Sequence, residues 1–135
     1  MAVKPASEPR RGRPMDVFGG EIRRRDVFPL LVLHLIAREP AYGNRLIEEI
    51  ETISEGVISV NPNTIYPLLR ELEARGMIEG RWEHPDRRTR RYYSITAAGR
   101  KEYRRLHAEV QPFLDSAIRS TGLIKAEIYG DDGDG

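Results

Sequence analysis

The chain of 135 residues contains no cysteine, which excludes disulfide bonds and thiolate metal sites and fits a reducing compartment. It also lacks a long hydrophobic run. The longest run, residues 27–37, is interrupted by His34 and falls far short of the ~20 residues needed to span a bilayer. The first residues are polar and basic, without the apolar segment of a signal peptide. We therefore expect a cytoplasmic protein with no membrane partner.

The chain has no large excess of charge of either sign, because 22 basic residues stand against 21 acidic ones and the net charge is +1. The total therefore says nothing about nucleic acid. The distribution along the chain is more informative. Residues 1–25 hold seven basic residues against three acidic ones, and residues 81–91 hold five arginines against two acidic residues. Local basic patches on a nearly neutral chain favour a nucleic-acid site of limited extent.

Catalytic and metal-binding patterns are also missing. No set of histidine, aspartate and glutamate residues has metal-ligand spacing, and the chain has no nucleophile elbow, phosphate-binding loop or dinucleotide fingerprint. We therefore expect no enzyme activity, no metal ion and no cofactor.

Residues 61–76 carry the most informative pattern in the chain. Asn61 is a favourable N-cap, Pro62 suits the first helical position, and Gly76 suits a left-handed turn after the helix. The predicted helix has one apolar stripe, formed by Ile65, Leu68, Leu69 and Leu72. Its other face carries hydrogen-bonding side chains, and an arginine-rich hairpin follows. A polar-faced helix beside a basic hairpin is typical of a winged helix that reads DNA.

The remaining elements follow from hydrophobic periodicity and end signals. The other expected helices are 27–38, capped by Asp26, then 42–53, and a long last helix that Thr96 caps and Pro112 kinks or splits. Residues 54–60 should form a loop or, at 57–60, a short strand. The expected strands are 77–83 and 90–95, joined by a polar loop at 84–89, with Trp82, Tyr93 and Ile95 facing inward.

This order of elements predicts a mainly α fold with a small β-hairpin, namely a winged helix-turn-helix followed by a C-terminal dimerisation helix. We expect four segments along the chain. They are a disordered basic arm at 1–20, a winged-helix DNA-binding domain at 21–96, a dimerisation helix at 97–122 and a flexible acidic tail at 123–135.

Motifs in several parts of the chain form a recognisable pattern over roughly residues 27–107. They are Ala41-Tyr42-Gly43-Asn44-Arg45-Leu46, the run 63–73 that contains Tyr66-Pro67-Leu68-Leu69, Gly76-Met77-Ile78, Arg90-Arg91-Tyr92-Tyr93-Ser94-Ile95-Thr96, and Gly99. In this pattern the chain closely resembles the PadR family of bacterial and archaeal transcriptional regulators.

The resemblance implies a homodimer that represses promoters by binding near-palindromic operators. In many members of the family a small molecule, such as a phenolic acid or a multidrug compound, releases the DNA. The implied partners are therefore double-stranded DNA, a second copy of the chain and a small aromatic effector. The single short C-terminal helix is similar to the smaller-sized branch, some of whose members stack planar drugs on a tryptophan in the last helix. This chain departs from that pattern, because its only tryptophan, Trp82, lies in the first predicted wing strand.

The candidate DNA-binding residues lie on the polar-faced helix, at the start of the second helix and in the wing. They are Tyr42, Asn44, Asn61, Asn63, Thr64, Tyr66, Pro67, Arg70, Arg87, Arg88 and Arg90. Asparagine and arginine can read base edges, whereas hydroxyl groups and wing arginines mostly contact phosphates. Two interpretations of Tyr42 are open, a phosphate contact or a core anchor. Arg91 lies either with the wing arginines or on the domain side of its strand.

A second class of function is a winged helix that serves only as a protein-interaction module. Such a module should carry apolar residues where Asn63, Tyr66 and Arg70 stand, so the sequence favours DNA binding over this alternative.

Two helices are expected to form the dimer interface. The first is apolar on every side, and the last has apolar residues at spacings of three and four. The expected interface residues are Phe28, Leu31, Leu35, Tyr103, Leu106, Val110, Phe113, Leu114 and Ala117. The resemblance places an effector pocket between these helices, near His34, Tyr103, His107 and Val110. The alternative is that His34 and His107 are ordinary hydrogen-bonded structural residues.

The N-terminal segment contains Arg11-Gly12-Arg13-Pro14, which resembles the core of AT-hook arms that lie in the minor groove. The alternative is a plain flexible tail.

Overall fold

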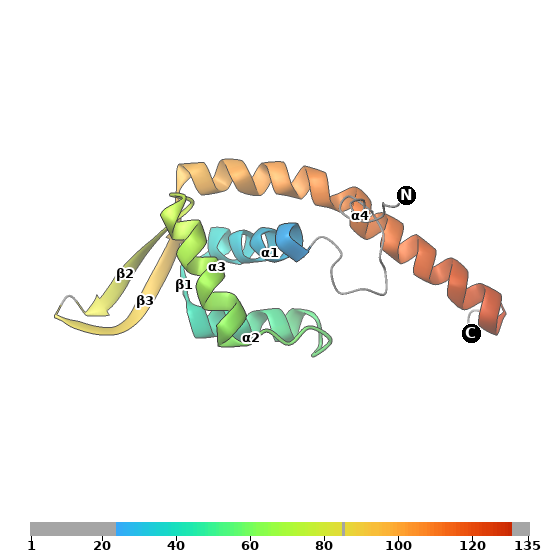
Figure 1. Cartoon of the computed structure of the whole chain (residues 1–135), viewed down its shortest axis with the longest axis horizontal. Coiled ribbons are helices and arrows are strands. Elements are labelled where there is room, and N and C mark those ends of the chain that lie inside the picture. Colours follow the sequence, from blue (N-terminus) through green and yellow to red (C-terminus); the bar gives the residue numbers. More distant parts are fainter. Residues whose placement is uncertain (1–23, 85, 131–135) are drawn as a thin grey trace, which may run out of the picture. The chain divides into compact units, whose positions relative to one another are not determined.

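The structure, a computed structural model, describes residues 24–84 and 86–130, which form four helices and three strands (Figure 1). Their order is α1 (Arg24–Arg38), β1 (Ala41–Tyr42), α2 (Gly43–Ile53), α3 (Pro62–Ala74), β2 (Ile78–His84), β3 (Arg87–Ile95) and α4 (Ala97–Tyr129). The chain divides into two compact units. Residues 28–106 form one, here called the winged-helix unit, and the other contains α4 from residue 107 onward. The expected N-terminal arm and its Arg-Gly-Arg-Pro segment lie outside the described residues.

One apolar core holds the winged-helix unit together. Val32, Leu33 and Ile36 of α1 are at most 1% exposed. The side chains packed in the same core come from α2, α3, β2 and the first turns of α4 and include Leu46, Ile50, Ile65, Leu69, Leu72, Ile78 and Leu106. Full burial of an aliphatic side chain of this size contributes about 1.5–3 kcal/mol, so this cluster is the main source of stability.

Helix α3 begins and ends as predicted. The Oδ1 atom of Asn61 accepts a hydrogen bond from the backbone N–H of Thr64 at 3.1 Å, and Pro62 is the first helical residue. Gly76 follows the helix with a φ angle of 77°. Most of the predicted apolar stripe is buried, whereas Leu68 is half-buried. Local end signals were therefore sufficient to place this helix.

The sheet has three strands, one more than predicted. It is antiparallel, in the order β1-β3-β2. Strand β1 pairs with Tyr92 and Tyr93 but has only two residues, too few for a period-2 pattern to reveal. The hairpin is also tighter than predicted, because β3 begins at Arg87, so that Arg87 and Arg88 belong to the strand and not to the loop. No strand forms at residues 57–60.

Several predicted boundaries were wrong. Helix α1 includes Arg24, so Asp26 lies in its first turn and does not cap it. Helix α4 continues to Tyr129 and therefore includes part of the expected flexible tail, of which residues 131–135 lie outside the described residues. Of the two outcomes predicted for Pro112, a kink or a split, the split does not occur, because α4 runs through it as one helix. A proline removes only one backbone hydrogen bond, which a helix of 33 residues tolerates.

Trp82 was expected to face inward and is instead 37% exposed. By strand alternation it shares a face with Ile78, which is 2% exposed. The hairpin continues past the helices of the core, as Figure 1 shows, so the same face that is buried near Ile78 is open near Trp82. The expectation for Tyr93 is confirmed, since it is 4% exposed, and Ile95 is half-buried.

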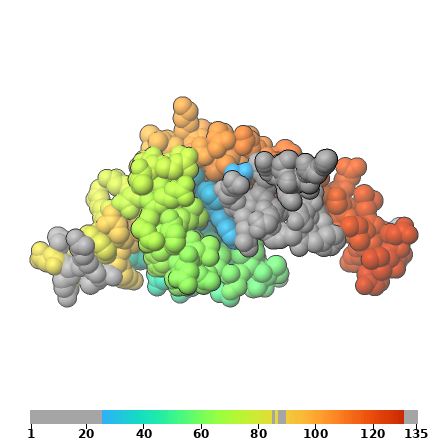
Figure 2. All heavy atoms as spheres, viewed as in Figure 1, coloured from blue at the N-terminus to red at the C-terminus, as the bar shows by residue number. Residues whose placement is uncertain are grey.

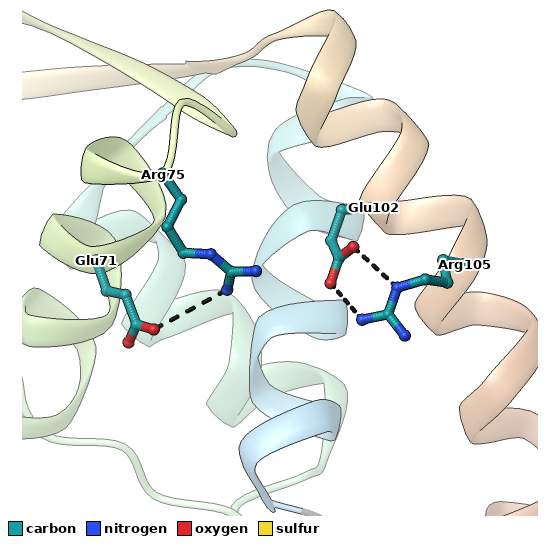
Figure 3. Close-up of polar contacts among 4 residues, drawn as sticks. All are labelled: Glu71, Arg75, Glu102 and Arg105. Carbon is teal, nitrogen blue, oxygen red and sulfur yellow. Dashed lines mark hydrogen bonds and ion pairs between the residues drawn. The ribbon is translucent and has the colours of Figure 1, made fainter.

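Two ion pairs lie where the end of α3 faces the beginning of α4 (Figure 3). Glu71 pairs with Arg75 along α3 at 3.9 Å, and Glu102 accepts two hydrogen bonds from Arg105, the shorter of 2.7 Å. Arg75 extends toward Glu102 (Figure 3). The hydrogen bonding by Arg105 chiefly lowers the pKa of Glu102, burial opposes this shift, and the charge of Arg75 adds to it.

None of the described helices is both long enough and apolar enough to cross a membrane.

Replacing the N-cap of α3 should destabilise the protein. Asn61→Ala should lower the free energy of unfolding by about 1 kcal/mol, because the N–H of Thr64 loses its partner. Asn63→Ala is the matched control on the same helix, since Asn63 is exposed, and it should change stability by less than ~0.5 kcal/mol. Chemical denaturation measures both, and equal losses would contradict the assigned cap.

The stabilising effect of Glu102 should depend on pH. Because its folded-state pKa lies below the ordinary value of 4.5, the ionised carboxylate stabilises the fold above pH 4.5, and this contribution is lost as the pH falls through the folded-state pKa. Glu102→Gln should therefore lower the melting temperature at neutral pH, and its difference from wild type should shrink in acid. Glu71→Gln, which removes an exposed ion pair, should have little effect at neutral pH. A Glu102→Gln deficit that persists unchanged at low pH would refute this assignment.

Candidate nucleic-acid interface

Helix α3 presents a polar face to solvent. Asn63, Thr64, Pro67 and Arg70 are all exposed, on the side away from the buried stripe. In Figure 2, the side chains of α2 and α3 (green to yellow-green) both reach the surface on the face in view. Asn61 is exposed at the beginning of this face, but its Oδ1 atom is occupied by the cap hydrogen bond.

Tyr66 was expected on the exposed face of α3 and is instead half-buried against the core. Its ring packs on Gly43 at the beginning of α2, so closely that a Cβ atom at Gly43 would come within 2.5 Å of it. Only glycine fits at this position without moving the ring. Tyr66 therefore holds α2 and α3 together.

Tyr42 is the N-cap residue of α2, and its side chain makes no capping hydrogen bond. Its ring centroid lies 4.9 Å from that of Tyr92, and the guanidinium of Arg90 lies 3.9 Å above it. Tyr42 is thus half-buried at the edge of the sheet and is not a core anchor. Arg90 also donates two hydrogen bonds to Glu83, at 3.1 and 3.0 Å, which raise the pKa of Arg90. Stacking and pairing together fix the position of this wing cation.

Arg91 lies on the domain side of its strand, the second of the two interpretations of this residue. It is half-buried, and it donates a hydrogen bond to Glu73 of α3. Its neighbour Tyr93 is buried, and this burial together with the carboxylate of Glu73 raises the pKa of Tyr93. The side chains of Arg87 and Arg88 lie outside what the structure describes.

These side chains border a cleft of about 730 Å³ between the beginning of α2, α3 and the wing. It is lined by Tyr42, Gly43, Asn44, Tyr66, Arg70, Glu73, Trp82, Arg90, Arg91 and Tyr93. Five of these residues were predicted to bind DNA, whereas sequence analysis did not place Gly43, Glu73, Trp82, Arg91 or Tyr93 at the site. The signal for some of them was present, because strand alternation puts Trp82, Arg91 and Tyr93 on one face of the hairpin.

The cleft attracts anions for two physical reasons. Among the described lining residues three arginines stand against the carboxylate of Glu73, and because Glu83 also pairs with Arg90 the excess is one positive charge. The first turn of α2, represented by Gly43 and Asn44, also borders it, and the N–H groups at this helix end have no side-chain cap. Unpaired N–H groups at a helix N-terminus carry partial positive charge and suit a phosphate oxygen.

Some residues expected at the dimer interface are not available for a contact between subunits. Leu35 and Leu106 belong to the core of the winged-helix unit, and Val110 is fully buried. Two residues of the expected effector pocket are hydrogen-bonded to each other. The Nδ1 atom of His34 lies 2.8 Å from the hydroxyl of Tyr103, so these two groups satisfy each other, as the structural interpretation of His34 predicts. The described residues contain no cluster of three or more potential metal ligands.

Comparison with known proteins identifies the family to which the chain belongs. Residues 32–105, more than half of the chain, match the family described as "Transcriptional regulator PadR-like family". The chain belongs to the PadR-like family of transcriptional regulators. This PadR-like protein is therefore a regulator and not an enzyme.

Two curated relatives of this PadR-like protein are also transcriptional regulators by name. It is 36% identical to Rv3488 of Mycobacterium tuberculosis over 77 residues, which are 57% of this chain and 69% of Rv3488. It is 34% identical to YqjI of Escherichia coli over 73 residues, which are 53% of this chain but only 32% of YqjI.

Solved structures support the same fold. A PadR family transcriptional regulator from Eggerthella lenta is 32% identical, with a TM-score of 0.57 over 73% of this chain and 84% of that one. A transcriptional regulator from Clostridium thermocellum has a TM-score of 0.62 over 71% of this chain and 93% of that one. At 23% identity, the second likeness concerns the fold alone.

Proposed function

We propose that this PadR-like regulator represses transcription by binding a near-palindromic operator as a homodimer. Helix α3 enters the major groove, where Asn63 and Arg70 contact base edges and Thr64 contacts a phosphate, and the wing follows the DNA backbone. The main support for this proposal is that the exposed polar face of α3 and the wing arginines border the same cleft.

Phosphate groups are held at the margin of this surface. Arg90 stands above Tyr42, and the uncapped first turn of α2 borders the same cleft. Arg87 and Arg88 precede Arg90 on β3 and add two basic residues to the sequence of the wing. Contacts of this kind release counterions from DNA and supply affinity that does not depend on sequence.

A protein-interaction module is less well supported. The exposed positions of α3 that such a module would use carry Asn63, Thr64 and Arg70, which are polar or charged. The half-buried Tyr66 is occupied by packing on Gly43.

Substitutions on α3 and on the wing should affect DNA binding differently. DNA fragments selected from a random pool by the purified protein provide the specific site. Arg70→Ala should cost about 1–3 kcal/mol on that site and little on scrambled DNA, because Arg70 reads bases. Arg88→Ala should weaken both, because a phosphate contact carries no sequence information. Fluorescence anisotropy measures each affinity.

Arg75→Ala is the matched control, since Arg75 is an exposed arginine after the same helix, is paired with Glu71 and extends toward α4. It should leave both affinities nearly unchanged. If Arg70→Ala weakened both DNAs equally, Arg70 would be a phosphate contact. If the protein selected no DNA, the proposed function would be wrong.

The proposed dimer uses the part of α4 that follows Pro112. Its large exposed apolar side chains are Leu114, Ile118, Leu123, Ile124, Ile128 and Tyr129, between 40% and 75% exposed. Most of them continue the stripe that includes Phe113 and Ala117, according to the ~100° turn per helical residue. An apolar stripe of this length on a helix in water marks an interaction surface. A second copy of the same helix is the partner that the operator symmetry requires.

Charged substitutions in this stripe should separate the dimer. Ile118→Asp combined with Ile128→Asp should yield folded monomers, because these side chains are 72% and 64% exposed and do not support the chain's own core. Leu123→Asp is the matched control, since Leu123 is 63% exposed but lies about 140° around the helix from both. Light scattering measures the mass. A double variant that stays dimeric would exclude this stripe as the interface.

Release by a small aromatic effector stays a prediction drawn from the family resemblance. The mutual hydrogen bond between His34 and Tyr103 does not add support for a ligand at that position.

A further inference from the structure

Among the described residues that line the cleft Glu73 is the only acidic one, and it is hydrogen-bonded to both strands of the wing. Its Oε2 atom accepts a hydrogen bond from Nη2 of Arg91 on β3 and another, of 3.3 Å, from the backbone N–H of Gly80 on β2. The same Nη2 atom of Arg91 donates to the carbonyl oxygen of Gly80 at 2.8 Å. One carboxylate of α3, one guanidinium of β3 and the backbone N–H and C=O of one residue of β2 thus form a closed network.

The surroundings of Arg91 are shaped to hold its side chain in this position. The guanidinium passes over Gly80, where an added Cβ atom would lie 2.7 Å from Nε and 2.8 Å from Nη2. It also lies 4.9 Å from the ring centroid of Trp82, within the range of a cation–π contact. The side chains of Arg91 and Glu73 are 26% and 31% exposed, so water screens their attraction less than it screens a surface pair.

The network lies between the two parts of the interface that must meet the DNA together. Glu73 follows Arg70 by three residues on α3, and Arg91 is adjacent to Arg90 on β3. The apolar core fixes α3 directly, whereas the hairpin near Trp82 extends beyond it. The angle between the wing and α3 therefore depends on polar contacts at the base of the wing.

We propose that Glu73 and Arg91 are positioning residues, which hold the wing at the angle where α3 and the wing arginines contact DNA simultaneously. This proposal rests on the proposed function. It predicts that Glu73 strengthens DNA binding, although its negative charge alone would weaken that binding. A carboxylate in a DNA-binding cleft repels phosphate, so its removal should strengthen binding by electrostatics alone. If the carboxylate positions the wing, its removal weakens binding instead.

The variant Glu73→Ala distinguishes the electrostatic effect of the carboxylate on DNA affinity from its positioning effect. We expect the variant to bind the selected DNA site about tenfold more weakly than wild type, the loss equivalent to one charge-assisted hydrogen bond. Glu71→Ala is the matched control: it removes the same charge from the same helix, but the ion pair that it breaks is the surface pair with Arg75. It should bind as tightly as wild type or slightly more tightly.

Arg91→Lys provides a second test that keeps the net charge and is expected to fold even if Glu73→Ala does not. Lysine lacks the planar guanidinium that passes over Gly80 and lies against the ring of Trp82, so this variant should also lose affinity. Circular dichroism confirms that each variant is folded. Affinity equal to or above that of wild type in either folded variant would overturn the proposal.

Trp82 supplies a measurement that does not require DNA. It is the only tryptophan in the chain and is stacked with Arg91, so its emission reports whether the guanidinium is in place. Emission should shift in Glu73→Ala and stay unchanged in Glu71→Ala. If wild type bound no DNA, the proposed function would fail, whereas an unshifted emission in Glu73→Ala would overturn the positioning role by itself.

Discussion

The winged-helix unit depends above all on keeping the apolar side chains of α1 away from water. Helix α1 has almost no polar face, so neighbours must cover it on several sides, and the core residues of α2, α3, β2 and early α4 do so. Helix α3 contributes one stripe to this cover, with Ile65, Leu69 and Leu72 buried. Its opposite face is therefore left to solvent, so that Asn63 and Arg70 are exposed, as the proposed DNA contact requires. The same burial that stabilises the fold exposes the surface proposed to read the operator.

Polar and aromatic contacts at the margin of the core set the finer geometry of the interface. Tyr66 packs on Gly43 and fixes the beginning of α2 against α3, while Glu73 and Arg91 join α3 to the wing. Apolar packing is not directional and needs only burial, whereas hydrogen bonds require particular distances and angles. A small core leaves the outer part of the hairpin uncovered, so the directional contacts at its base decide where the wing lies.

Sequence patterns were reliable where a rule acts over a few residues. The cap at Asn61, the turn at Gly76 and the cap at Thr96, whose Oγ1 accepts a hydrogen bond from the N–H of Gly99, are all confirmed. Predictions failed where the outcome depends on distant neighbours. Trp82 has the alternation of a buried residue, but nothing in the sequence shows how far the core extends beneath the hairpin. Strand β1 is stabilised by β3, about fifty residues later, and has too few residues to show a period of its own.

The sequence by itself determined the order of the four helices and the two hairpin strands, the apolar stripe and polar face of α3, and the family, because these depend on spacing and residue type. Only the tertiary structure decided which polar residues of the candidate site meet. Tyr42 could have been a core anchor, and Arg91 could have joined the wing arginines. The positions of both were settled by partners far along the chain, Arg90 and Glu73 respectively. The physical reason is that hydrogen bonds and ring contacts form between groups that folding brings together. The spacing of residues along the chain does not predict which groups these are.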